Sequence, residues 1–223
     1  MISFKLRLRA VTLFTVGGGV PDIMGADVAL IKKARASGSE FEYVYYIPGS
    51  TVKGVLRTVA SRIAPAYGFS ACGEVRPERI ESSHVGGPCD VCKLFGRPGK
   101  DPSVASSLFV SDFDLINDVR PVTVVRVALD DKTLTAMEGA LYSVEHLPLG
   151  AEFEGELRLS EHSKHLLPLL LLAIAGLRTD RIGRGSTCDA KVVDDGALDA
   201  HVEPKWRPLL QELRAWLWEG VVK

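Results

Sequence analysis

The order of strands and helices along the chain predicts an α+β fold with a ferredoxin-like (RRM-like) core. Two strand patterns that alternate apolar and charged residues, at 3–14 and 151–159, are each followed by a helical pattern. With three irregular stretches set aside, the order is strand, helix, strand, strand, helix, strand. We therefore expect one domain, residues 1–223, with insertions at about 15–46, 67–105 and 116–148.

Charge predicts that the first and third core strands are neighbours. Residues 3–14 place Lys5, Arg7 and Arg9 on one face, and residues 151–159 place three glutamates on one face, namely Glu152, Glu154 and Glu156. Opposite charges stabilise cross-strand pairs. We therefore interpret the basic stripe as salt-bridged sheet surface and not as an RNA-binding surface.

The overall composition is that of an ordinary globular protein. The formal net charge is −1, which excludes a generic polyanion binder. Residues 1–111 carry 14 Lys and Arg against 9 Asp and Glu, whereas residues 112–223 carry 13 against 19. Halves of opposite sign suit head-to-tail stacking of identical subunits, although chance unevenness within one domain explains them equally well.

Other compositional signals concern location and source. The chain opens on a charged strand pattern and not on an apolar signal segment, and its longest apolar stretch, Leu166–Leu177, is too short to cross a bilayer. We expect a cytoplasmic protein that does not contact membranes. Asn117 and Gln211 are the only side-chain amides, a depletion that suggests a thermophilic source.

Residues 47–63 are predicted to form a turn followed by an amphipathic helix. A Pro-Gly dipeptide interrupts the preceding strand, and Ser50 is the expected N-cap residue. Lys53 and Arg57 are four residues apart and share a face away from the apolar stripe. Free N–H groups, the helix dipole and these two cations suit a phosphate. The alternative is a capped surface helix with solvated basic side chains.

The segment 67–105 is rich in Gly, Pro and charge and carries a predicted metal site. Cys89 and Cys92 have zinc-knuckle spacing, and Cys72 and His84 complete a set of four ligands. Four protein ligands leave no open position, so a structural zinc ion is expected and a catalytic one is not. A disulfide is disfavoured in a chain without an export signal.

The second half of the chain contains the remaining predicted elements. Residues 107–115 form a strand, and the segment from there to Pro148 alternates like an extended hairpin. Residues 162–178 are apolar nearly all round and predict a buried helix. A last amphipathic helix is expected at Pro204–Gly220.

A basic glycine-rich turn lies between the buried helix and the last core strand. Gly183 and Gly185 allow close approach of the backbone to a phosphate, and Arg181 and Arg184 supply positive charge. A Gly-Arg-Gly sequence alone is weak evidence, but its position before a predicted strand strengthens it.

Three segments in this order resemble the CRISPR-associated RAMP superfamily. They are Ile47-Pro48-Gly49-Ser50 with the following Lys53-Gly54 and Leu56-Arg57, then Cys89-x-x-Cys92-Lys93-Leu94-Phe95-Gly96, and then the turn at Gly183–Gly185. The chain looks most like the small backbone subunit of type III effector complexes. It departs from the pattern at Ser186-Thr187-Cys188, where a further glycine is usual.

The resemblance implies roles for the insertions. The stretch 15–46 corresponds to a lid and 116–148 to a thumb that wedges between bases, for which Leu134 or Met137 is suited. Gly25-Ala26-Asp27-Val28 resembles the lid segment whose aspartate cuts target RNA. Asp27 would then position or deprotonate a 2′-hydroxyl, or hold a divalent ion such as Mg²⁺.

The resemblance also implies a function with partners. The chain would bind guide RNA along its phosphates, polymerise on it head to tail beside other effector subunits, and cut paired target RNA. The expected contacts are Ser50, Lys53, Arg57, Met137, Arg181, Gly183, Arg184 and Gly185. Three alternatives stay open: a non-catalytic backbone subunit, a guide-processing endonuclease with His146 or His162 as base, and a zinc-stabilised protein-binding module.

Overall fold

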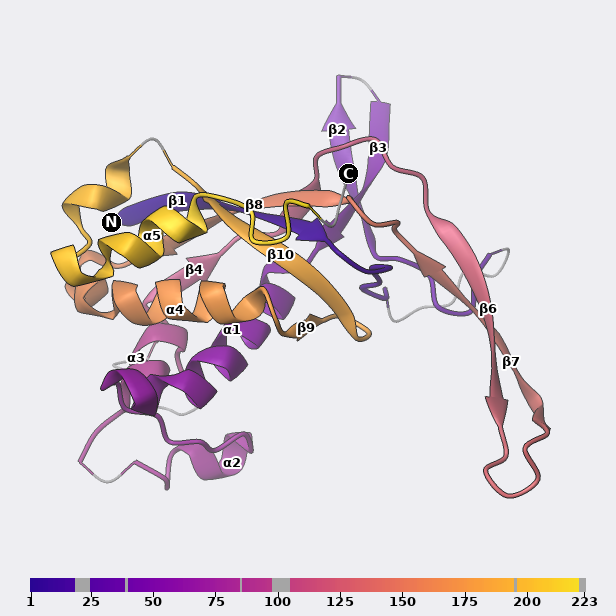
Figure 1. Ribbon diagram of the computed structural model, residues 1–223, viewed down its shortest axis with the longest axis horizontal. Helices are drawn as coiled ribbons and strands as arrows, with labels where there is room; N and C mark the ends of the chain where they lie inside the picture. The colour runs from indigo at the N-terminus through magenta and orange to yellow at the C-terminus, as the bar shows by residue number, and fades with distance from the viewer. Residues whose placement is uncertain (19–24, 39, 85, 98–104, 195, 221–223) are drawn as a thin grey trace.

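The computed structural model describes residues 1–18, 25–38, 40–84, 86–97, 105–194 and 196–220. An antiparallel sheet carries α1 (Gly49–Ile63) and α4 (Leu167–Leu177) on one face (Figure 1). The apolar core lies between the sheet and these two helices, and the inward side chains of both are buried. The smaller helices are α2 (Pro77–Ile80), α3 (Asp90–Phe95) and α5 (Arg207–Leu213), with 3₁₀ turns at Ala64–Tyr67, Glu161–Leu166, Ala197–Ala200 and Pro204–Trp206.

The centre of the sheet has the order β10–β1–β8, followed by two short strands that both pair with β8. These strands are β1 (Ile2–Ala10), β8 (Glu152–Leu159), β10 (Ser186–Val193), β4 (Leu108–Val110) and β5 (Phe113–Leu115). The two-residue strand β9 (Arg181–Ile182) extends the sheet beside β10. All these pairs are antiparallel.

The predicted pairing of the first and third core strands is confirmed. In the register of β1 and β8, Lys5 lies opposite Glu156, Arg7 opposite Glu154 and Arg9 opposite Glu152. Lys5 Nζ and an Arg7 guanidinium nitrogen each lie 2.7 Å from a Glu154 carboxylate oxygen. The hydrogen bonds from Lys5 and Arg7 hold the pKa of Glu154 below its usual value. This part of the sheet face is therefore salt-bridged.

The lid contains a hairpin where the sequence led us to expect a loop up to about Glu40. Strands β2 (Lys32–Ser37) and β3 (Glu40–Ile47) pair with each other, and β3 joins the sheet beside β5. The prediction of a loop is wrong because Phe41 and Tyr43 favour a strand, and the small Ala36 and Ala34 lie opposite them. Gly19, at the end of the glycine run, lies outside the described residues.

Helix α1 begins differently from the prediction. It starts at Gly49, and Pro48 occupies the N-cap position expected for Ser50. The Gly49 N–H donates to Asp112 Oδ1 over 3.0 Å, and Asp112 lies in the break between β4 and β5. A carboxylate therefore already occupies part of the place expected for a phosphate. The sequence could not reveal this cap because Asp112 is 63 residues away.

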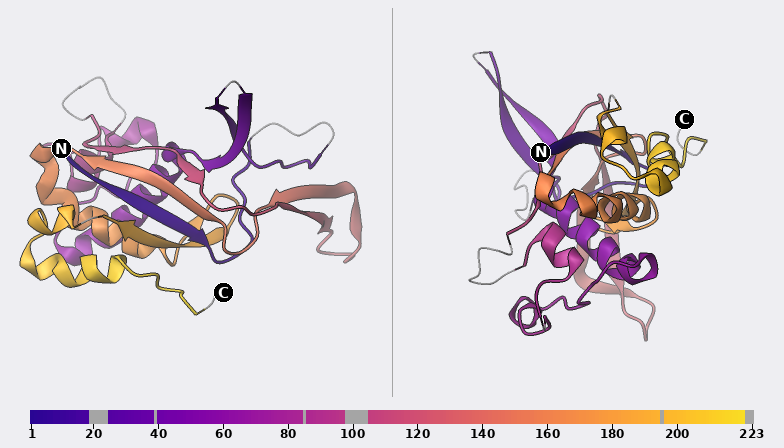
Figure 2. Two further views of the ribbon diagram at one scale, coloured as in Figure 1. Left: turned by 90° about the horizontal axis from the view of Figure 1, so that it is seen from above. Right: turned by 90° about the vertical axis from the view of Figure 1, so that its left-hand side faces the viewer.

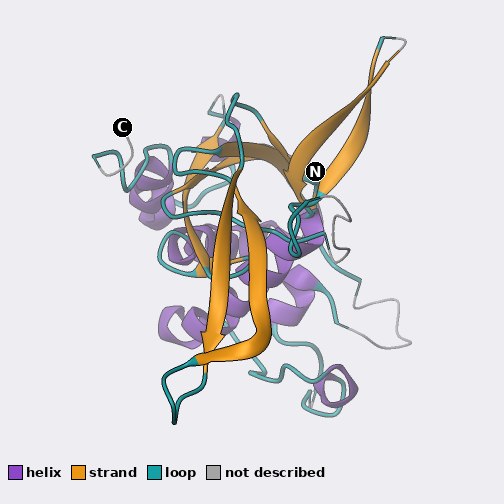
Figure 3. Ribbon diagram, turned by 90° about the vertical axis from the view of Figure 1, so that its right-hand side faces the viewer, coloured by secondary structure: helices purple, strands orange, loops and turns teal. Residues whose placement is uncertain are grey.

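The segment 116–148 forms the expected hairpin. Strands β6 (Val122–Leu129) and β7 (Ala136–His146) pair with each other in a separate two-stranded sheet (Figure 3). The hairpin projects from the end of the main sheet that lies away from the N-terminus (Figure 2). Leu134 lies in its turn with φ of 55° and is 76% exposed, so it is a tip residue, and Met137 follows at the start of β7.

The C-terminal helices are shorter than predicted. The buried helix is divided by a kink at Ser163, and α4 proper starts at Leu167. The last helix ends at Leu213 and not at Gly220. Beyond that residue, the backbone forms hydrogen bonds with side chains and not with a further helical turn. Arg178 donates to the carbonyl of Ala215, and Asp189 accepts a hydrogen bond from the N–H of Trp218. In the described residues, no helix is long and apolar enough to cross a membrane.

Gly49→Ala should destabilise the fold, because a Cβ at this position collides with the carbonyl oxygens of Val110 and Ser111. We expect a loss of about 1–3 kcal/mol, measured as a lower Tm. The matched control is Gly54→Ala in the same helix, where a Cβ meets open space. That variant should gain up to about 1 kcal/mol from helix propensity. Equal Tm values for the two variants would contradict the close approach of α1 to the strand break.

Candidate nucleic-acid interface and metal cluster

The four predicted metal ligands lie together beside α3. The ligand atoms of Cys72, His84, Cys89 and Cys92 are all within 4.8 Å of one another. The sulfurs of Cys72 and Cys92 are 3.9 Å apart, and His84 Nε2 is 3.3 Å from the Cys89 sulfur. A tetrahedral ion with bonds of about 2.3 Å needs ligand separations of about 3.8 Å. The cluster therefore fits a four-coordinate zinc ion.

Further side chains orient this cluster. His84 Nδ1 donates to the Ile80 carbonyl over 2.5 Å, which turns Nε2 toward the cysteines. Arg57 donates to the Cys92 sulfur over 3.2 Å and to the Gly96 carbonyl. Burial and the neighbouring Cys89 raise the pKa of the Cys92 thiol to about 12. A bound metal cation would instead favour the thiolate form of Cys92. The positive charge of the Arg57 guanidinium also stabilises the thiolate.

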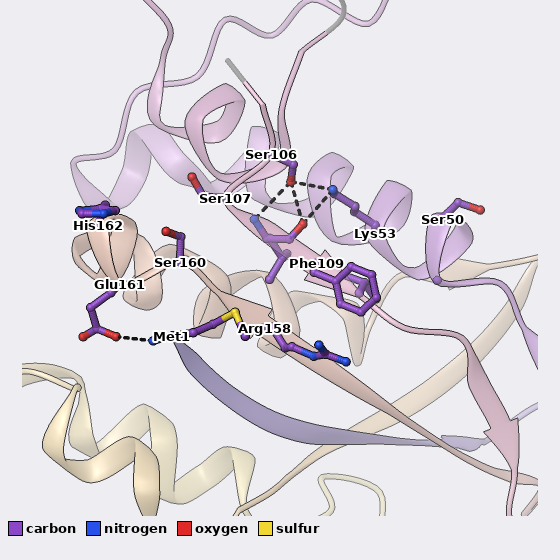
Figure 4. A pocket seen from close by; sticks show the side chains of 13 residues that line it. Met1, Ser50, Lys53, Ser106, Ser107, Phe109, Arg158, Ser160, Glu161 and His162 are labelled. Carbon is purple, nitrogen blue, oxygen red and sulfur yellow. Dashed lines mark hydrogen bonds and ion pairs between the residues drawn. The ribbon is translucent and has the colours of Figure 1, made fainter. Parts of the chain in front are cut away.

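Ser50 and Lys53 lie in a groove between the start of α1 and β4 (Figure 4). Lys53 Nζ donates to Ser106 Oγ over 2.6 Å and to the Leu108 carbonyl over 2.9 Å, and its burial lowers its pKa. Both Lys53 and Arg57 therefore already have protein partners. Their predicted RNA contacts stay predictions.

Thr15 connects the glycine-rich turn to the base of the β6–β7 hairpin. Its carbonyl accepts the Arg184 N–H over 3.0 Å, and its own N–H donates to Ser186 Oγ over 3.0 Å. Gly183 has φ of 64° and leaves no room for a Cβ beside the Thr15 carbonyl. The Thr15 hydroxyl donates to the Glu145 carbonyl over 2.8 Å, on strand β7. The turn is thus held against the hairpin.

A basic cavity lies where the turn meets the hairpin. Its volume is about 310 Å³, and its lining residues are Arg126, Tyr142, Val144, His146 and Arg184. Among the residues described, no carboxylate pairs with either arginine. Two guanidinium groups without a carboxylate partner suit an anion, and the planar donors of arginine match the geometry of a phosphate or a carboxylate.

The state of His146 follows from its hydrogen bonds. It is 4% exposed, and Nδ1 lies 2.5 Å from the Thr15 hydroxyl oxygen. Because that hydroxyl gives its proton to the Glu145 carbonyl, Nδ1 must be the donor to Thr15. Nε2 then accepts from Arg126, 3.4 Å away. Burial, with a smaller effect of Arg126, lowers the pKa of His146, so it is neutral and orients Arg126.

Asp27 lies on the other side of the hairpin base. Its Oδ2 accepts the N–H of Ser143 over 2.7 Å and the Ser143 hydroxyl over 2.8 Å. These bonds, with the backbone one the largest, lower the pKa of the exposed Asp27 carboxyl. The metal cluster is the one group of three or more candidate ligands found among the described residues, and Asp27 is not part of it. No ligand set for Mg²⁺ therefore accompanies Asp27 there.

The predicted site residues fall into separate places. Gly183, Arg184 and Gly185 lie in the turn beside the cavity, Arg181 is exposed on β9, and Met137 is half exposed near the hairpin tip. The groove with Ser50 and Lys53 borders Met1, whereas the turn lies near the Ala10 end of β1. At about 3.3 Å per residue, the length of β1 separates these ends by about 25 Å. The predicted contacts therefore fall into two groups that line different cavities, and their binding to RNA stays a prediction.

Sequence reasoning missed several residues of the interface, namely Thr15, Arg126, Tyr142, Ser143 and Glu145. One of them carried a signal, because Arg126 is the only charged residue in Val122–Leu129, where every other residue except Thr123 is apolar. Thr15, Ser143 and Glu145 act through contacts that span more than a hundred residues.

Comparison with known proteins gives three findings. A chain in a solved structure titled "Type IV-B CRISPR Complex" has a similar fold, with a TM-score of 0.59 and 16% sequence identity. The match covers 87% of this chain and 91% of that chain. No match was found among curated proteins. The sequence model of the RAMP superfamily matches residues 8–187, most of the chain, and the protein therefore belongs to the RAMP superfamily.

Proposed function

We propose that this protein is the guide-RNA-binding backbone subunit of a CRISPR effector complex of type III. Family membership and the fold shared with a chain of a type IV-B CRISPR complex support an effector subunit. The three motifs and the Cys/His cluster support the type III assignment. The strand order β10–β1–β8–β4/β5 supports a ferredoxin-like core, because it is the order of that fold.

The single observation that carries the proposal is the basic cavity between the glycine-rich turn and the hairpin base. Arg126 and Arg184 converge there without a carboxylate partner in the described residues, whereas Lys5 and Arg7 of the sheet are ion-paired to Glu154. We infer that a phosphate of the guide strand binds in this cavity. The protein then grips the RNA by charge and shape, and base pairing reads the sequence.

The β6–β7 hairpin suits the role of a thumb. Leu134 at its tip and Met137 beside it are exposed apolar side chains that could insert between bases. Further exposed apolar residues follow along both strands: Val122, Val125, Val127, Leu129 and Leu141. In a monomer they contact water, so the hairpin is suited to an assembly. We infer that it packs on RNA and on the next copy in a head-to-tail array.

We also propose that Asp27 takes part in cutting target RNA. The 2′-hydroxyl oxygen forms a bond to the adjacent phosphorus while the bond to the 5′-oxygen breaks, which leaves a 2′,3′-cyclic phosphate. Asp27 accepts the hydrogen bond of the attacking hydroxyl and orients it. The hydroxyl proton passes to a solvent hydroxide ion, and the 5′-oxygen takes a proton from water. The lowered pKa of Asp27 makes it a weak base, which favours orientation over proton abstraction.

Purified protein should contain one zinc ion per chain, and chelation should lower its Tm because the ion holds an insertion that lacks a core of its own. Cys92→Ser should lose the zinc, as measured by atomic emission. Cys188→Ala is the matched control, since Cys188 is a buried cysteine of β10 outside the cluster. Zinc retained in Cys92→Ser, or absent from the native protein, would contradict the structural zinc.

Arg126→Gln and Arg184→Gln should each weaken binding of single-stranded guide RNA about tenfold, or about 1.4 kcal/mol. Because each variant neutralises one phosphate fewer, the slope of log K against log salt should also become shallower by about 0.7. The control is Arg7→Gln, because Arg7 is ion-paired to Glu154 in the sheet. If all three variants bind alike across a salt titration, the phosphate does not bind in the cavity.

Asp27→Ala should abolish cutting of paired target RNA in the assembled complex and leave guide binding intact. Single-turnover cleavage at saturating target measures this, and Asp131→Asn, an exposed aspartate in the hairpin turn, is the control. Undiminished cutting would favour the non-catalytic backbone subunit.

Cleavage of repeat RNA by the isolated protein, lost in His146→Ala or His162→Ala, would instead favour the guide-processing enzyme. Absence of any RNA affinity at low salt would favour a protein-binding module.

A further inference from the structure

We propose that Ser143, on strand β7, is the positioning residue of Asp27 and fixes which carboxylate oxygen meets the target RNA. This inference rests on the proposed cutting role of Asp27. The two residues exchange three hydrogen bonds: Ser143 N–H and Oγ–H donate to Asp27 Oδ2, and the Asp27 N–H donates to Ser143 Oγ. Every polar group of Ser143 except its carbonyl is therefore directed to Asp27.

The geometry leaves one carboxylate oxygen available. Both donors of Ser143 reach Oδ2, at 2.7 and 2.8 Å, and no donor reaches Oδ1 from the described part of the chain. An exposed aspartate without such bonds changes rotamer freely and loses entropy when it binds. With Oδ2 held at two points, Oδ1 keeps a fixed direction and can accept the hydrogen bond of a 2′-hydroxyl without that cost.

A separate pair of backbone hydrogen bonds holds the strand segment that carries Asp27. The Val28 N–H donates to the Ser143 carbonyl over 3.0 Å, and the Glu145 N–H donates to the Val28 carbonyl over 2.9 Å. The Leu30 N–H donates to Glu145 Oε2 over 2.9 Å. None of these bonds uses the Ser143 hydroxyl. Removal of that hydroxyl therefore takes away one of the two donors to Oδ2, so that the carboxylate is held by the Ser143 N–H alone, and it leaves the lid attached to the hairpin.

The placement also explains why the aspartate is in the lid and its partner in the hairpin. Residues 27–30 run beside β7, with Val28 bridged to Val144. Strand β7 alternates, so Tyr142, Val144 and His146 line the basic cavity, whereas Ser143 and Glu145 bond to the lid. One strand thus holds the proposed phosphate site with one face and Asp27 with the other.

The test uses the assembled complex, purified with its guide RNA, and paired target RNA. Ser143→Ala should lower the single-turnover cutting rate at saturating target about tenfold, with unchanged target affinity. Ser143→Thr retains the hydroxyl and suits a strand, so it should restore most of the rate. Asp27→Asn in the same preparation should abolish cutting.

Amide hydrogen exchange at Val28 and Leu30, whose acceptors do not include the Ser143 hydroxyl, separates positioning from a merely structural role. The Asp27 amide is left out because it donates to Ser143 Oγ. Protection should be the same in the native protein and in Ser143→Ala. A full rate in Ser143→Ala, or a loss of rate that comes with a loss of protection, would overturn the inference while the role of Asp27 stands. If Asp27→Asn cuts normally, the cutting role of Asp27 is wrong and the inference is overturned with it.

Discussion

The arrangement of the interface depends on one buried residue, Thr15. Its carbonyl, amide and hydroxyl each bond to a different segment, namely the glycine-rich turn, the start of β10 and strand β7. Thr15 is fully buried, so water cannot replace a missing partner, and an unsatisfied group there costs about 1–3 kcal/mol. The turn, the hairpin and His146 are therefore fixed relative to one another, which brings Arg126 and Arg184 to one cavity.

A protein with a net charge of −1 can bind a polyanion only if some of its cations are paired with carboxylates and others are not. In the sheet, Lys5 and Arg7 pair with Glu154, and at the lid Lys33 lies near Asp112 and Asp114. Asp112 also caps the helix that looked like an anion site. The cavity differs because its two arginines face an imidazole held neutral and a tyrosine. The partners of the cations, and not their number, therefore distinguish the cavity that we propose as the phosphate site.

The features that the sequence predicted well depend on local spacing or on matched patterns. Cys89 and Cys92 show their shared role through spacing alone, and the β1–β8 pairing follows from two complementary charge patterns. The errors have one physical cause. Whether Gly49 offers a free N–H, or Arg57 a free guanidinium, depends on Asp112, Gly96 and Cys92, whose approach is set by the tertiary fold. The position of Thr15 against His146 could not be predicted for the same reason.

The insertions share a mode of attachment that follows from their composition. The apolar core lies between the sheet and its helices, and the lid adds Leu30 to it and the metal segment adds Val91, Leu94 and Phe95. The rest of these insertions and the hairpin expose much of their surface. Each is anchored by polar contacts: Asp27 and Leu30 for the lid, Arg57 for the metal cluster, and Thr15 for the hairpin. Polar anchors demand specific geometry and contribute little net stability each. The insertions are therefore held in a definite direction by contacts that each add little to the stability of the fold.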